Sequence, residues 1–253
     1  MAMHLNHGIL DSKLRENKVF KRKSIEYKKN AFTLLNTDPY FRFKRILIEA
    51  SNYTDFSQSP EWLDLGCHAG QFMSIVKDVH KVNVTGIDDW DLKEQWTEDE
   101  YTYYQFDLNK DWSEILKGNK FHVISALEVI EHIIDTDAFL KRCNNVLHSN
   151  GLLIISTPNI NCLRNRIIVP LGKYPAFMEY RNIIHHVRLY NIATIKEHLK
   201  KYGFQIKKIS GVSFLPEGAN KYPILRNLSD GLGNIFPSLS NNIIIVASKI
   251  KEC

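Results

Sequence analysis

The chain has 253 residues, of which 44% are hydrophobic and 24% are charged, and its formal net charge at pH 7 is +5. This composition is typical of a globular domain with a full core, and it excludes a disordered or fibrous chain. The mildly basic charge allows an anionic substrate without requiring nucleic acid.

The cysteines and the apolar runs bear on where the protein works. The four cysteines form no CxxC pair, so the sequence predicts neither a zinc knuckle nor a disulfide framework. The first residues lack the apolar region of a signal peptide, and the longest apolar runs, such as 243–247, are too short to span a bilayer. We therefore expect a cytoplasmic protein without a membrane span.

Residues 1–58 are largely polar with a helical pattern, and we expect them to form a helical N-terminal cap on a Rossmann-like domain at 59–253. Basic residues gather between Lys13 and Lys29, as in a solvated helix face or arm. The apolar positions expected to dock on the domain are Phe32, Leu34, Leu35, Phe41, Phe43, Ile46 and Leu47.

From residue 60 onward, apolar runs alternate with the spacing of amphipathic helices. The candidate strands are 62–65, 82–87, 102–106, 121–126, 152–156, 204–212 and 243–248. One of the helices is expected to have Asn191 as its N-cap and to end at Gly203. This alternation predicts an α/β fold with a Rossmann-like, seven-stranded, mostly parallel and doubly wound sheet. Such sheets bind ligands at the carboxyl ends of their strands.

Two stretches, about 159–190 and 214–240, are too long to be simple connections, and both are rich in Asn, Pro, Tyr and Gly. Long insertions at the ligand end of a sheet usually form lids, substrate walls or subunit contacts. We expect inserted lid segments here, which would also suit a homodimer.

The segment 62–72 predicts a buried strand, a glycine-bearing turn and the start of a helix. Gly66 and Gly70 let the backbone approach a ligand closely, and the helix N-terminus offers unpaired N–H groups. Asp64, at the end of the strand, can accept hydrogen bonds from a cationic or hydroxyl-bearing ligand. The segment indicates a nucleotide-type pocket.

Acidic residues also follow the next two strands. Asp88, next to Asp89, can accept hydrogen bonds from both ribose hydroxyls of an adenosine. Asp107 supplies a carboxylate for an adenine amino group. These positions indicate a ligand that contains adenosine.

Over about residues 60–210 the chain resembles the class I S-adenosylmethionine-dependent methyltransferases, in particular the small-molecule O-methyltransferases of the ubiquinone and sugar type. Its matching motifs stand in family order and are Leu63–Cys67, Gly86–Asp88, Asp107, Glu128–His132, Gly151–Asn159 and His186–Tyr190. A nicotinamide dehydrogenase would need a third glycine in the first turn, where this chain has Gln71 and Phe72.

The resemblance implies S-adenosylmethionine as the cofactor. The residues that it implies in binding are Asp64, Gly66, Cys67, His68, Gly70, Asp88, Asp89, Asp107, Leu108 and Ala126. Asp64 and the two glycines would line the methionine end, Asp88 would bind the ribose, and Asp107 the adenine, on which Leu108 packs. Ala126 would lie near the sulfonium. The family usually has glycine at position 68, so His68 must tolerate a glycine-like backbone.

Methyl transfer to a hydroxyl requires the acceptor to lose a proton. His186 matches a histidine of the family pattern and is the candidate base. His185 could equally serve, and both could be surface loop histidines.

A metal site is a further hypothesis. On a helix, Glu128, Glu131 and His132 would share one face, and a Glu-x-x-Glu-His motif with a later histidine, here His186, resembles the metal site of small-RNA 2′-O-methyltransferases and some quinone O-methyltransferases. These ligands would suit Mg²⁺, Mn²⁺ or Zn²⁺. The helix dipole alone would also favour acids in a first turn.

The sequence therefore predicts O-methylation of a small hydroxylated or anionic metabolite, such as a sugar, a nucleotide-linked intermediate or a surface-polysaccharide precursor. The acceptor would be a small molecule that carries phosphate or sugar. An RNA 2′-O-methyltransferase is one alternative, although no RNA-binding module accompanies the fold. A non-catalytic, cofactor-binding partner subunit is the other.

Overall fold

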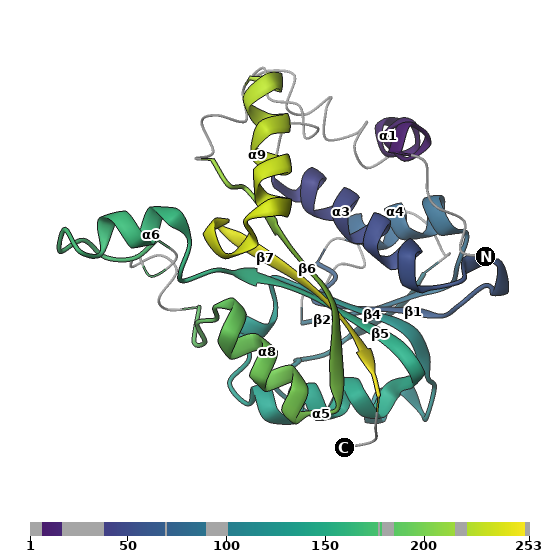
Figure 1. Cartoon of the computed structure of the whole chain (residues 1–253). Helices are drawn as coiled ribbons and strands as arrows, with labels where there is room; N and C mark the ends of the chain where they lie inside the picture. The colour runs from purple at the N-terminus through teal and green to yellow at the C-terminus, as the bar shows by residue number, and fades with distance from the viewer. Residues whose placement is uncertain are drawn as a thin grey trace.

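The computed structural model describes residues 7–16, 38–68, 70–89, 101–176, 178, 185–215 and 222–250. They form a seven-stranded sheet with the strand order β3-β2-β1-β4-β5-β7-β6, in which β7 runs antiparallel to both of its neighbours (Figure 1). Its strands are β1 (Trp62–Leu65), β2 (Val84–Asp88), β3 (Thr102–Gln105), β4 (Phe121–Leu127), β5 (Leu147–Pro158), β6 (Phe204–Val212) and β7 (Asn242–Lys249). The predicted doubly wound, mostly parallel sheet is confirmed.

Several strand boundaries differ from the prediction by one to five residues, and pairing explains two of them. β2 begins at Val84 rather than at 82, because Val84 is already paired with Trp62, the first residue of the short β1. β5 extends to Pro158 because the antiparallel β7 pairs with it as far as Asn242. Strand partners, rather than apolar runs alone, fix these ends.

Helices cover both faces of the sheet. They are α1 (His7–Glu16), α3 (Asp38–Tyr53), α4 (Gln71–His80), α5 (Thr136–Val146), α6 (Leu163–Ile168), α8 (Ile192–Lys201) and α9 (Pro223–Ile235). Short 3₁₀ helices lie at η3 (Phe56–Gln58), η4 (Glu114–Leu116), η5 (Ile130–His132) and η7 (Pro237–Leu239). Figure 1 shows α5 and α8 on one face of the sheet and α1, α3 and α4 on the other.

The apolar run of β5 explains why both faces must be covered. Leu153 and Ile155 belong to the core on the α5 and α8 side, whereas Leu152 and Ile154 belong to the core under α3 and α4. Because successive side chains of a strand point to opposite faces, a run without alternation is buried only between two layers.

The N-terminal helices pack on the second of these cores. Phe43, Ile46 and Leu47 of α3 are buried there, as expected, while the predicted docking positions in 17–37 lie outside the described residues. Among the helices in the described ranges, none combines the length and apolar character that a bilayer crossing demands.

The two long insertions leave the sheet at the carboxyl edge of the parallel strands. α6 follows the end of β5, and α9 with η7 connects the end of β6 to the start of β7. Between them, α8 begins with the predicted N-cap, since Asn191 and Thr194 form a capping box, and Gly203 follows its end with a positive φ of 76°.

Candidate functional site

The turn between β1 and α4 has the backbone that a close ligand approach requires. Gly66 has a φ of 72°, and a Cβ added there would lie 2.3 Å from Cγ2 of Val129, so only glycine fits. Gly70 has a φ of 65°. His68 adopts a φ of 44°, as its glycine-like position required, and its N–H donates to Oδ2 of Asp88 at 2.7 Å.

Asp64 is buried at the end of β1. The hydroxyl of Ser125 on β4 donates to its Oδ1 at 2.6 Å, and Trp62 donates from Nε1 to the same hydroxyl at 2.8 Å. Burial raises the pKa of Asp64 to about 7, and the charge of Asp88 adds to the rise, while the bond from Ser125 opposes it. A cationic ligand would stabilise the ionised form of this carboxyl.

Asp88, Asp89 and Asp107 gather at the carboxyl edge of β2 and β3. The pKa of Asp89 is raised above its ordinary value. Partial burial is the largest cause, and the hydrogen bond with Asp88 and the charges of Asp88 and Asp107 add to it. The backbone carbonyl of Asp88 accepts from the N–H of Phe106, which holds the start of the Asp107 loop against β2. The three predicted acids therefore share one edge with the glycine turn.

The other implied cofactor residues lie nearby in the core. Cys67 is buried in the core under α4, and Leu108 and Ala126 belong with Ile87 to the opposite core. Their assignment to the cofactor stays a prediction.

A second polar group lies beyond the end of β4. Candidate ligand atoms of Glu131, His132 and His186 all lie within 4.8 Å of one another. The rings of His132 and His186 have centroids 4.9 Å apart. Three of the four predicted metal-ligating residues are thus brought together from segments far apart in the chain.

The prediction that Glu128, Glu131 and His132 share one face of a helix is wrong. Only 130–132 are helical, as the 3₁₀ helix η5, and Glu128 has a left-handed φ of 58°. Glu128 consequently lies outside the group formed by Glu131, His132 and His186.

Glu131 is buried with one oxygen satisfied. Its Oε2 accepts from the hydroxyl of Thr157 at 3.1 Å, and its Oε1 has no hydrogen-bond partner among the described residues. Burial raises the pKa of Glu131 well above its ordinary value, and the charge of Glu128 adds to the effect. An orphaned carboxylate oxygen beside two imidazoles fits a divalent cation, which would satisfy it.

Backbone hydrogen bonds hold the segment that carries His186 against η5. The N–H groups of Val187 and Arg188 donate to the carbonyl of Glu131 at 2.8 and 3.0 Å. His132 Nδ1 lies 2.9 Å from the carbonyl of His185, which can only accept, so Nδ1 carries the proton and Nε2 keeps its lone pair. The side chain of His185 is exposed and that of His186 is half-buried.

Glu128 has a different set of partners, which the sequence reasoning missed. Arg42 on α3 forms an ion pair with its Oε1, and Ser156 on β5 donates to the same oxygen at 2.7 Å. Asn242 at the start of β7 donates to Oε2 at 2.7 Å. No local signal links these residues, since only the fold brings them to Glu128.

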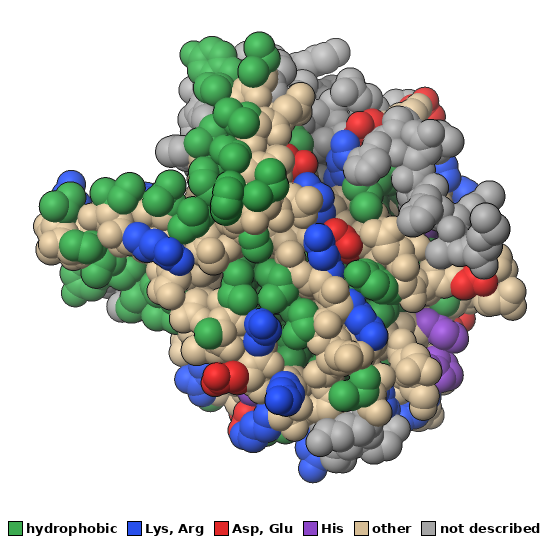
Figure 2. All heavy atoms as spheres, in the orientation of Figure 1, with side chains coloured by type: hydrophobic (Ala, Val, Ile, Leu, Met, Phe, Trp, Pro, Cys, Tyr) green, Lys and Arg blue, Asp and Glu red, His purple; other side chains and the backbone are tan. Residues whose placement is uncertain are grey.

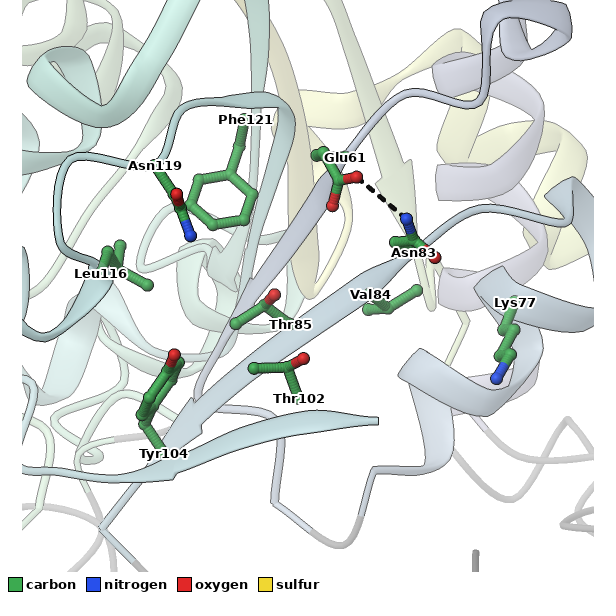
Figure 3. A pocket seen from close by; sticks show the side chains of 10 residues that line it. All are labelled: Glu61, Lys77, Asn83, Val84, Thr85, Thr102, Tyr104, Leu116, Asn119 and Phe121. Atoms are coloured by element: carbon green, nitrogen blue, oxygen red, sulfur yellow. Dashed lines mark hydrogen bonds between the residues drawn. The ribbon is translucent and has the colours of Figure 1, made fainter. Parts of the chain in front are cut away.

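A polar cavity of about 310 Å³ lies at the opposite edge of the sheet (Figure 3). Val84, Thr102 and Phe121 line it where β2, β3 and β4 begin, and on one side of it Asn83 donates to Glu61 at 3.0 Å. None of the predicted site residues lines this cavity, so the glycine turn and the acids mark a separate site.

Comparisons with known proteins identify the family of the chain. A family model described as "Methyltransferase domain" matches residues 28–209. A ubiquinone biosynthesis O-methyltransferase of Rhodopseudomonas palustris (strain HaA2) is 29% identical over 103 residues, which cover 41% of this chain and 41% of the relative. A second one, of Bradyrhizobium diazoefficiens, is 46% identical over 48 residues, which cover 19% of each chain. The chain thus spans less than half the length of these curated relatives.

Solved structures share the fold at low identity. A SAM-dependent methyltransferase from Archaeoglobus fulgidus aligns with a TM-score of 0.56 and 19% identity, over 82% of this chain and 91% of that one. One from Mesorhizobium loti aligns with a TM-score of 0.53 and 15% identity, over 76% and 91%. With a family match over most of its length, the chain belongs to the methyltransferase-domain family.

Proposed function

We propose that the protein methylates the oxygen of a small hydroxylated molecule, with Glu131, His132 and His186 holding a divalent cation at the acceptor position. The observation that carries the proposal is the buried Glu131, whose Oε1 has no partner among the described residues and whose carboxylate lies within 4.8 Å of ring nitrogens of two histidines. The name of the ubiquinone biosynthesis relatives, which are O-methyltransferases, also supports an oxygen acceptor.

In this reaction the acceptor oxygen attacks the methyl carbon in line with the sulfonium, so that a C–O bond forms as the S–C bond breaks. S-adenosylhomocysteine leaves, and the hydroxyl proton passes to a base. When bound, Mg²⁺, Mn²⁺ or Zn²⁺ supplies Lewis-acid stabilisation of the acceptor oxygen. If an ion is bound, His186 is one of its ligands, and the exposed His185 is the candidate base. If no ion is bound, His186 itself is the candidate base.

At the cofactor end, we propose that Asp88 binds the ribose, Asp107 the adenine and Asp64 the methionine ammonium. The shared edge of these acids and the glycine turn between β1 and α4 support this arrangement. We further propose that 1–58 is a cap on the domain at 59–253, with lid segments at 159–190 and 214–240. The docking of α3 on the domain core supports the cap.

The acceptor classes that we propose are sugars, nucleotide-linked intermediates and surface-polysaccharide precursors. The names of the relatives add intermediates of ubiquinone biosynthesis. The free, buried Cys67, Cys143 and Cys162 support a reducing, cytoplasmic location. An RNA acceptor would instead use the basic N-terminal segment, and its methylation would weaken steeply with salt.

The test is transfer of a labelled methyl group from S-adenosylmethionine to a panel of these acceptors, before and after chelation. We expect transfer to a hydroxyl, loss of turnover on chelation, and recovery when Mg²⁺, Mn²⁺ or Zn²⁺ is restored. Glu131→Gln should behave like the chelated enzyme, whereas Glu197→Gln, at an exposed acid on α8, should not. Full turnover after exhaustive chelation would remove the metal from the proposal.

A further inference from the structure

Helix α9 packs on the sheet through its small and polar residues. A Cβ added to Gly233 would lie 2.6 Å from the carbonyl oxygen of Gly211 on β6, so the two backbones touch. The buried Ser229 accepts from the N–H of Leu215 at 2.9 Å, and Asp230 pairs with Arg45 on α3 at 2.9 Å. The inward face of α9 therefore contains few large apolar side chains.

The described outward face of α9 is largely apolar, which reverses the usual pattern of a surface helix. Ile224 is 83% exposed and Ile235 is 67% exposed, and Leu228 lies between them on the same face. Leu225 beside them is also exposed. Among the described side chains of α9, Asn227 is the one exposed polar residue beside these apolar positions.

The first insertion extends the apolar surface. In the arm formed by 163–174, which contains α6, Leu171 is 71% exposed and Tyr174 is 74% exposed, and Ile167 and Val169 are exposed as well. Figure 2 shows apolar side chains gathered along α9 at the top and along this arm at the left. We call the outward face of α9 and the arm together the apolar ridge. A surface of this kind marks an interaction site.

The charges on the arm indicate what the apolar ridge contacts. The sequence 159–178 has no Asp or Glu, while it contains Arg164, Arg166 and Lys173. Apolar side chains with basic residues around them are typical of segments that lie in the interface of an anionic bilayer. A two-fold dimer built on this arm would bring the basic residues of both copies into one interface without an acidic residue of 159–178 to offset them, which is unfavourable.

We propose that the apolar ridge docks on the surface of an anionic phospholipid bilayer. Both parts of the ridge leave the carboxyl edge of the sheet, where the cofactor acids and the group Glu131, His132 and His186 also lie. Docking would turn this edge toward the membrane, so an acceptor could reach the site from the bilayer surface.

The test is co-sedimentation of the full chain with phosphatidylcholine vesicles that do or do not contain phosphatidylglycerol. We expect binding to the anionic vesicles, with an affinity at least about tenfold lower for Ile224→Ser/Leu228→Ser, since each side chain loses its burial in lipid. Lys173→Ala should lower the affinity about fivefold, and added salt should act in the same direction. The matched control is Ile250→Ser, because Ile250 is 58% exposed but follows β7 at the opposite edge.

These measurements require neither turnover nor a known acceptor, so they stand apart from the proposed reaction. Circular dichroism of each variant will show that the exposed substitutions leave the fold intact. Equal binding of the wild type and Ile224→Ser/Leu228→Ser would overturn the proposal. It would also be overturned if sedimentation velocity showed a dimer that these substitutions dissociate while vesicles bind nothing, since a second copy would then cover the ridge.

Discussion

Arg42 on α3 and Glu128 beyond β4 form an ion pair with 2.9 Å between Nη1 and Oε1, and both side chains are largely shielded from solvent. Helix α3 therefore reaches the residues that follow β4. Glu128 is next to Val129, which lies against Gly66 of the glycine turn, and its charge acts on Glu131. Through this pair, α3 is connected to the candidate site.

Arg42→Met should lower both stability and turnover. Removing one partner of a shielded ion pair leaves Glu128 with a poorly compensated charge, at a cost of about 1 to 3 kcal/mol. Arg45→Met is the control, because Arg45 on the same helix pairs with Asp230 at 2.9 Å, away from Glu128. Urea unfolding should detect both changes, and only Arg42→Met should also lower turnover at saturating cofactor. Equal turnover in the two variants would separate Glu128 from the site.

The ionisation of Asp64 should couple cofactor binding and stability to pH. Its folded pKa of about 7 is above the ordinary 3.8, so the folded state holds the proton more tightly and loses stability as pH rises from about 4 to about 7, by up to about 4 kcal/mol. In the proposed site the ammonium of S-adenosylmethionine pairs with ionised Asp64, so the cofactor should bind more tightly as pH rises across the same range. Calorimetry at several pH values should show both trends, and Asp64→Asn should remove them. A wild-type profile retained by Asp64→Asn would assign the titration to another group.

Gly66→Ala should be far more damaging than its conformation alone explains. Gly66 and Gly172 share a φ of 72°, but only the Cβ added at Gly66 meets an atom, at 2.3 Å. Gly172→Ala therefore measures the backbone cost of about 1 kcal/mol, and Gly66→Ala adds about 1 to 3 kcal/mol of overpacking and displaces the turn. We expect cofactor affinity to fall only in Gly66→Ala, as calorimetry would show. Similar losses in the two variants would contradict this account.

Thr157 should tune the proposed metal site through Glu131. Its hydroxyl donates to Oε2 at 3.1 Å and fixes the carboxylate, so Thr157→Val should weaken Mn²⁺ binding by about tenfold. Thr157→Ser retains the hydroxyl and should restore affinity, which a loss of packing alone would not allow. Titration of Mn²⁺ into the metal-free protein provides the measurement. A Thr157→Val variant with wild-type affinity would place the ion elsewhere.

The sequence predicts the strands of the sheet well because each strand is indicated by a local run of apolar residues. The run 62–65 and the run 204–212 become strands at the predicted residues, and the glycine turn follows the first of them. The left-handed backbone of His68 was also foreseeable, since it stands at a position that the family fills with glycine.

The site beyond β4 could be predicted only in part. His186 joins Glu131 and His132 as expected, but the helical rule failed for Glu128, because its positive φ turns it away before η5 begins. Arg42, Ser156 and Asn242 come to Glu128 from α3, β5 and β7. Such long-range contacts depend on the finished topology and leave no periodic trace in a single sequence.

The antiparallel β7 lies between β5 and β6, although both of these strands precede it in the chain. During ribosomal synthesis, β5 and β6 therefore emerge with a gap between them, and each exposes an unpaired strand edge until β7 arrives. Asn242, the first residue of β7, is also the latest of the partners of Glu128 to be made. The order of synthesis thus delays completion of this corner of the enzyme until the last strand inserts.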